Sequence, residues 1–112
     1  MGDGMRKCDT VTLVIDVFPE RSLPSDVGSQ VFKVMEEACE VRSAFVELQM
    51  EHRLSDEMPH GGDAGVDEAA TDLADEIADC VQACVNLASM CGIDLAEALS
   101  RVHDKNESRG RL

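Results

Sequence analysis

Two stretches of the chain decide its fold, and they read VFKVMEEACEVRSAFVEL at residues 31–48 and TDLADEIADCVQACVNLASM at residues 71–90. Apolar residues recur in both at intervals of three and four, which is the spacing of one face of an α-helix. Strand-like alternation is nearly absent from the rest of the chain. The sequence therefore predicts an all-α fold, a bundle built around two long central helices.

Start and stop signals bound these two helices. Ser25 is expected to cap the first, which should run to about Glu51. The second should run from about Asp67 to Met90, where Gly92 is expected to stop it. The predicted apolar face of the first helix consists of Val31, Val34, Met35, Ala38, Val41, Phe45 and Leu48. That of the second consists of Leu73, Ile77, Cys80, Cys84, Leu87, Ala88 and Cys91, with the cysteines packing as small hydrophobic residues.

Two shorter stretches flank the central helices. Residues 10–18, TVTLVIDVF, fit either a strand or a short buried helix, because periodicity cannot decide at this length. Near the other end, Asp94 is expected to cap a last helix, with Glu97 three residues later as in a capping box. This helix should fray after Ser108, and its seam should consist of Leu95, Leu99 and Val102. With residues 10–18 helical, the chain would form a four-helix bundle.

The length of 112 residues allows one domain, spanning residues 1–112. Residues 1–24 form an N-terminal segment, and residues 109–112 form a C-terminal tail. The stretch HRLSDEMPHGGDAGV, residues 52–66, contains Pro59 and three glycines and has no apolar period, so it is expected to be a flexible loop.

Charge and composition exclude several classes of partner. Ten Lys and Arg residues against 23 Asp and Glu give a formal net charge of −13, which opposes binding to a phosphate backbone. No apolar run approaches the roughly 20 residues of a membrane span, and no secretory signal is visible. The five cysteines form no CxxC pair and are expected to be reduced thiols. We therefore expect a cytoplasmic protein that binds neither nucleic acid nor membrane, with a thin core that oligomerisation would thicken.

Acidic residues border the predicted core on both central helices. On a helical projection Glu37 falls at the margin of the apolar face, with Glu36 and Glu40 on the same flank. Glu76 falls at the matching margin of the other helix, with Asp79 beside it. An unpaired carboxylate at such a margin is costly, and facing carboxylates suit Mg²⁺ or Mn²⁺. The same acids also fit ordinary solvated helix faces, and the residues alone leave these two interpretations about equal.

The order of several short motifs resembles a known family. KVMEEACE at residues 33–40, followed by DEIAD at residues 75–79, is similar to the EExxE and ExxD signature of MazG-like nucleoside triphosphate pyrophosphohydrolases. The resemblance continues through a Gly-Ile-Asp turn at residues 92–94 and the ending KNESRGR at residues 105–111. It implies an oligomeric four-helix bundle, a homodimer or homotetramer, that cleaves a nucleoside triphosphate to the monophosphate and pyrophosphate with Mg²⁺ or Mn²⁺.

The resemblance also implies roles for single residues. Glu36 would be the catalytic residue that orients or deprotonates water. The metal ligands would be Glu37, Glu40, Glu76 and Asp79, and the residues that contact substrate phosphate would be Lys105, Asn106 and Arg109. Lys105 and Arg109 also fit a purely structural role, because cations in a last helical turn complement the helix dipole.

One departure from the family pattern is visible. Thirty-five residues separate Glu40 from Glu76, more than the usual spacer, and the expected loop at residues 52–66 would absorb the excess. The N-terminal segment matches the family poorly, so the preferred base is not predicted. The alternative function is a non-catalytic helical module whose acidic face docks a basic partner.

Overall fold

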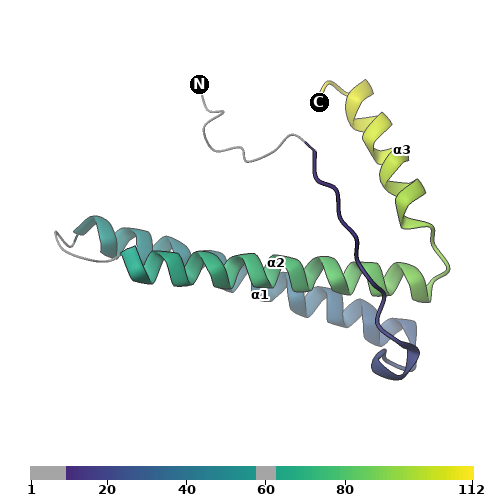
Figure 1. Cartoon of the computed structure of the whole chain (residues 1–112), viewed down its shortest axis with the longest axis horizontal. Coiled ribbons are helices and arrows are strands. Elements are labelled where there is room, and N and C mark those ends of the chain that lie inside the picture. The colour runs from purple at the N-terminus through teal and green to yellow at the C-terminus, as the bar shows by residue number, and fades with distance from the viewer. Residues whose placement is uncertain (1–9, 58–62) are drawn as a thin grey trace.

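The structure, a computed structural model, describes residues 10–57 and 63–112, and within these residues all regular structure is helical (Figure 1). A short 3₁₀ turn, η2 (Glu20–Ser22), precedes three α-helices. These are α1 (Val27–Glu57), α2 (Asp63–Met90) and α3 (Leu95–Ser108). The prediction of an all-α fold with two long helices is confirmed.

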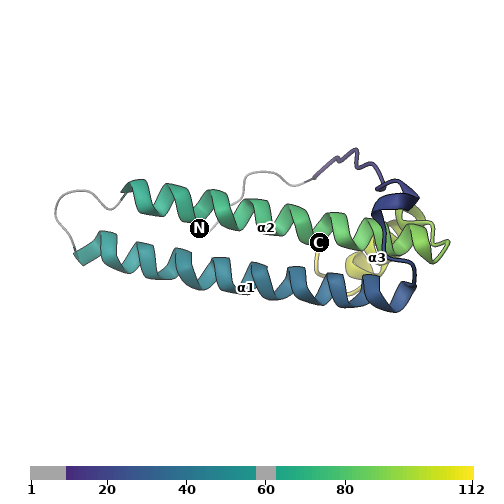
Figure 2. The same cartoon turned by 90° about the horizontal axis from the view of Figure 1, so that it is seen from below.

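Helices α1 and α2 form an antiparallel pair, and they lie side by side in both views (Figures 1 and 2). Their facing positions are buried or half-buried and follow one another in alternating steps of three and four residues, the spacing of a coiled-coil seam. On α1 these positions are Gln30, Val34, Glu37, Val41, Ala44, Leu48 and Glu51. On α2 they are Val66, Ala69, Leu73, Glu76, Cys80, Ala83 and Leu87.

The predicted apolar face of α1 is only half correct. Val34, Val41 and Leu48 lie in the seam, whereas Val31, Met35, Ala38 and Phe45 lie on an exposed flank beside it. Apolar residues cover much of the circumference of α1, so two overlapping stripes fit the sequence equally well. In the structure α1 buries the stripe that includes the polar residues Gln30, Glu37 and Glu51.

The two long helices differ from the prediction at their ends, and the connection between them is shorter than predicted. Asp26, not Ser25, caps α1, because its Oδ1 accepts the backbone N–H of Ser29 at 2.8 Å. This hydrogen bond and one from the Ser29 hydroxyl lower the pKa of the Asp26 carboxyl. The loop expected at residues 52–66 is wrong at both ends, since α1 continues to Glu57 and α2 begins at Asp63. Residues 58–62 of that stretch lie outside the described residues.

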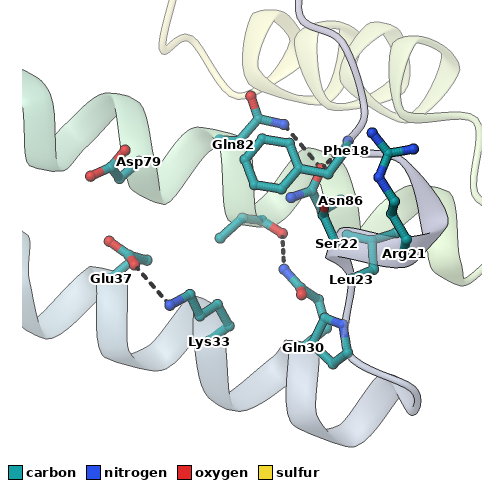
Figure 3. A pocket seen from close by; sticks show the side chains of 12 residues that line it. Phe18, Arg21, Ser22, Leu23, Gln30, Lys33, Glu37, Asp79, Gln82 and Asn86 are labelled. Atoms are coloured by element: carbon teal, nitrogen blue, oxygen red, sulfur yellow. Dashed lines mark hydrogen bonds and ion pairs between the residues drawn. The ribbon is translucent and has the colours of Figure 1, made fainter.

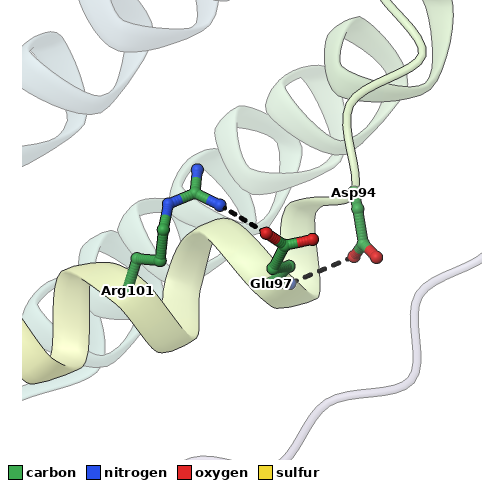
Figure 4. Close-up of polar contacts among 3 residues, drawn as sticks. All are labelled: Asp94, Glu97 and Arg101. Carbon is green, nitrogen blue, oxygen red and sulfur yellow. Dashed lines mark hydrogen bonds and ion pairs between the residues drawn. The ribbon is translucent and has the colours of Figure 1, made fainter.

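Both predicted signals between α2 and α3 are confirmed. Gly92 has a φ of 67°, and its N–H donates to the carbonyl of Ser89 while that of Ile93 donates to the carbonyl of Ala88. These two bonds make a Schellman motif, which requires a left-handed residue. Asp94 then caps α3 by accepting the backbone N–H of Glu97 at 3.0 Å (Figure 4).

Residues 10–18 are neither strand nor helix, so the described part of the chain contributes three α-helices rather than four. The segment crosses α2 in an extended form (Figure 1). Two side-chain amides of α2 hold it: Asn86 accepts the backbone N–H of Phe18 at 3.1 Å, and Gln82 donates to the carbonyl of Asp16 at 2.9 Å. An extended backbone offers these groups to side chains, whereas a helix would use them internally.

The protein has an open shape with a thin core, as predicted. Its Cα radius of gyration is 17.7 Å, compared with about 13 Å for a compact domain of this length. Among the described residues the buried apolar side chains are those of three alanines, Ala69, Ala83 and Ala88. Helix α3 leaves the α1–α2 pair (Figure 1), and its predicted seam residue Leu99 is 60% exposed.

We expect Asp94→Ala to loosen α3 without unfolding the α1–α2 pair. Loss of an N-cap costs about 1 kcal/mol, and α3 has little tertiary packing to offset it. Amide hydrogen exchange should therefore accelerate throughout the first turns of α3 and stay unchanged at the centres of α1 and α2. The exposed Asp104→Ala in the same helix is the matched control. Equal acceleration in both variants would contradict a role for the cap.

Candidate functional site

One buried hydrogen bond sets the register of the α1–α2 pair. The side-chain amide Nε2 of Gln30 donates to the backbone carbonyl of Ala83 at 3.0 Å. Seven residues further along α1 is Glu37, and seven residues back along α2 is Glu76. Because the helices are antiparallel, these steps run in the same direction in space, and Glu37 lies opposite Glu76. Both glutamates occupy seam positions, and the Glu37 side chain is only 17% exposed.

The electrostatics of Glu76 reflect this crowding. Partial burial raises its pKa above the ordinary value, and the negative charges of neighbouring carboxylates raise it further. In decreasing order of influence these neighbours are Glu40, Asp79, Glu37 and Asp75. The structure therefore places the other three predicted metal ligands, Glu37, Glu40 and Asp79, near Glu76.

Two cavities open beside these carboxylates. The first, about 520 Å³, has Glu37 and Asp79 in its wall, and the ammonium Nζ of Lys33 lies 3.8 Å from the Glu37 carboxylate (Figure 3). The second, about 380 Å³, is lined by Glu40 and Glu76 together with further acidic residues of both helices. Lys33 is the one cation that reaches the four-carboxylate group among the described ion pairs.

The first cavity also contains residues that the sequence reasoning missed. Gln30 and Asn86 are 2% and 3% exposed, and Gln82 and Phe18 complete the wall near them. Their signal in the sequence is weak: Gln30 and Lys33 precede Glu37, and Gln82 and Asn86 follow Asp79, at helical intervals of three and four. The contribution of Phe18 depends on where the extended segment runs, which no local pattern indicates.

Four other candidate residues lie elsewhere. Glu36 is exposed and lines neither cavity. Lys105, Asn106 and Arg109 belong to α3 and its C-terminal end, which contribute nothing to either cavity. Asn106 is half-buried and accepts the Nη1 of Arg111 at 3.3 Å. Within one chain, the predicted phosphate-contacting residues are therefore separate from the carboxylates.

The sequence predicted that three cysteines, Cys80, Cys84 and Cys91, pack in the apolar face of the second long helix. This prediction holds for Cys80 alone of the three. Cys80 is half-buried in the seam, whereas Cys84 and Cys91 are exposed. Partial burial and the neighbouring Cys80 raise the pKa of the Cys84 thiol, which keeps it protonated at neutral pH. Cys84 projects next to Ile77 on the exposed flank of α2, so it contributes to an apolar surface rather than to the core of the single chain.

The donor set fits a hard divalent cation in its chemistry, since all four side chains offer carboxylate oxygens. Among the described residues, however, no group of three or more His, Cys, Asp or Glu side chains is arranged to hold a metal ion. Glu40 and Asp79 are exposed, and such side chains change rotamer within nanoseconds. Binding of one ion by three of these carboxylates would require rotations of this kind.

Comparison with known proteins adds no assignment. No protein-family model matches the chain, and no curated protein or solved structure is significantly similar to it. No single helix among the described residues is long and apolar enough to cross a membrane, and α2 with α3 passes such a test only as a pair bent by 113°.

The raised pKa of Glu76 makes stability depend on pH. The folded protein holds this proton more tightly than the unfolded chain, so the ionised carboxylate opposes folding at pH values above its pKa. We expect Glu76→Gln to raise the melting temperature of the metal-free protein at pH 7. The difference should narrow as the pH falls through about 4 toward about 3, where glutamate is protonated in both states.

Thermal unfolding followed by circular dichroism in EDTA measures this difference. The exposed Glu107→Gln on α3 removes the same charge from a place outside the carboxylate group and should leave the melting temperature nearly unchanged. A lower melting temperature for Glu76→Gln at pH 7 would show that Glu76 makes a stabilising interaction instead.

Proposed function

We propose that the protein is a Mg²⁺-dependent nucleoside triphosphate pyrophosphohydrolase, which cleaves (d)NTP to (d)NMP and pyrophosphate in house-cleaning or nucleotide-pool control. The observation that carries the proposal is that Glu37 and Glu76 face each other in the α1–α2 seam, with Glu40 and Asp79 close enough to raise the pKa of Glu76. The family resemblance of the surrounding motifs supplies the reaction. Mn²⁺ is expected to substitute for Mg²⁺.

In this proposal the four carboxylates would hold the cation. A bound divalent cation offsets charge on the triphosphate and lowers the pKa of a water molecule. To hold one ion, Glu40 and Asp79 would turn toward Glu37 and Glu76, because among the described residues no three carboxylates converge in the structure. Lys33, which is paired with Glu37 in the wall of the first cavity, would bind a phosphate oxygen of the substrate. Glu36 would accept a proton from water, an assignment that rests on the sequence resemblance.

The open shape supports an oligomer. The chain exposes 8811 Å², whereas a compact monomer of this size exposes about 6000 Å². In helical projection the acidic flanks of α1 and α2 share one side of the pair, and apolar flanks share the other. We call the second side the apolar face. It consists of Val31, Met35, Phe45 and Val46 on α1 and of Ile77 and Cys84 on α2.

We propose that a second copy covers the apolar face, so that two α1–α2 pairs complete a four-helix bundle in a homodimer or homotetramer. Such an arrangement would also account for the distant position of the phosphate-contacting residues. Lys105, Asn106 and Arg109 cannot act on the cavities of their own chain as it stands, and α3 extends away from it (Figure 1). They would serve the carboxylates of a neighbouring copy.

The reaction is tested by pyrophosphate release from a panel of NTPs and dNTPs with Mg²⁺ and with EDTA. We expect metal-dependent release that falls by about a hundredfold or more in Glu37→Gln and in Glu76→Gln, because each variant removes a charged ligand. Glu107→Gln should retain full activity. Both inactive variants should remain helical by circular dichroism.

Absence of release from every nucleotide by the folded, Mg²⁺-treated protein would overturn the proposal. A basic protein partner of the acidic side would then be sought, as expected for a non-catalytic helical module.

A site shared between copies is tested by complementation. We mix inactive Glu37→Gln with inactive Arg109→Ala, dissociate the copies and let them reassociate. In a dimer with shared sites, half of the molecules are mixed and each has one intact site, so about a quarter of the wild-type activity should return. No recovery after verified exchange would show that Arg109 acts within its own chain or not at all.

A further inference from the structure

Two buried amides in the first cavity each leave one of their two polar atoms without a hydrogen-bond partner in the described residues. Gln30 donates through Nε2 to Ala83, and Asn86 accepts through Oδ1 from the N–H of Phe18 and from Gln82. Among the described residues nothing bonds to Gln30 Oε1 or to Asn86 Nδ2. No fully buried polar side-chain atom in this part of the chain lacks a partner, so both free atoms open onto the cavity (Figure 3).

The hydrogen bonds also fix which atom of each amide is free. Because Nε2 of Gln30 faces a carbonyl and Oδ1 of Asn86 faces an N–H group, neither amide can be reversed without losing its partner. The cavity therefore offers one acceptor, Gln30 Oε1, and one donor, Asn86 Nδ2. Because both atoms open onto the cavity, water can bond to them in the free protein, and a ligand that displaces this water must offer the complementary pair.

The amides stand at a fixed distance from the carboxylates. Gln30 precedes Glu37 by seven residues on α1, and Asn86 follows Asp79 by seven residues on α2. Seven residues of helix measure about 10 Å, and the antiparallel helices place both amides on the same side of the carboxylates. The cavity thus has one end at Glu37, Lys33 and Asp79 and another at the two amides, where the ring of Phe18 and the guanidinium of Arg21 also line the wall (Figure 3).

We infer that the amide end of this cavity binds the nucleobase of the substrate, with Gln30 and Asn86 as the residues that determine base specificity. The inference rests on the proposed function, which places the phosphates at the end that contains Lys33. A nucleobase carries a donor and an acceptor next to each other on one edge of a planar ring, and this edge complements the two free amide atoms. The Phe18 ring supplies an apolar surface for the flat face.

The test uses nucleosides, which have no phosphates and need no metal. The metal-free full-length chain is titrated with cytidine, uridine, adenosine and guanosine, and with ribose as the base-free control, in ¹⁵N-correlated NMR spectra. At least one nucleoside should shift the side-chain NH₂ signals of Gln30 and Asn86 and the backbone signal of Phe18, whereas ribose should shift none. No such shift with any nucleoside, or equal shifts with ribose, would overturn the inference.

Two variants probe the free atoms separately. Gln30→Met keeps the side-chain length but removes the bond to Ala83 together with the acceptor, so the ¹⁵N spectrum of the free variant must first show unchanged backbone signals along the α1–α2 seam. With the seam intact, the variant should bind the preferred nucleoside about fivefold more weakly, or worse. Gln49→Met, on the exposed surface of α1, is the matched control and should not change the affinity. Asn86→Asp keeps the acceptor for Phe18 and replaces the free donor by an oxygen, so it should change the ranking of the four nucleosides.

The outcomes separate this inference from the proposed function. Nucleoside binding without pyrophosphate release would contradict the proposed reaction and support the base site. Pyrophosphate release with an unchanged nucleoside ranking in Asn86→Asp and unchanged affinity in Gln30→Met would overturn the base site and leave the reaction standing.

Discussion

The rest of the structure depends on the single register in which α1 pairs with α2. The buried bond from Gln30 to the carbonyl of Ala83 specifies that register, because it is a directional contact between the two helices in a seam that also contains aliphatic residues and glutamates. A slip of one residue would move Glu37 away from Glu76. Polar groups inside a helical seam commonly select one alignment at some cost in stability, and this seam has the same design.

Local interactions made the elements of the fold predictable. The periodicity indicated both long helices, while Gly92 and Asp94 marked the turn to α3 because their effect depends only on neighbouring backbone groups. The face that α1 buries was harder to predict. Val31 and Met35 are as apolar as Val34 and Val41, and only the partner helix decides which of them are covered. The path of residues 10–18 likewise depends on distant amides at Gln82 and Asn86.

The candidate site was predictable to the same extent. Projection placed Glu37 and Glu76 at matching core margins, and the register brings them opposite each other. The amide end of the first cavity escaped prediction, because Gln30 and Asn86 are ordinary polar residues until their burial is known. The separation of Arg109 from the carboxylates also depends on the direction of α3, which follows from the turn at Gly92 and from the packing that α3 lacks.

The acidic side and the apolar face of the α1–α2 pair suit different partners. The ionised carboxylates of the seam oppose folding, and with a net charge of −13 and only Lys33 paired nearby, the chain does not neutralise them itself. A triphosphate would add to this repulsion unless a cation accompanied it. The apolar face lies on the opposite side of the same pair, so the α1–α2 pair of a second copy would pack there without covering the carboxylates. The fold therefore places the surface suited to assembly and the surface suited to a charged ligand where neither obstructs the other.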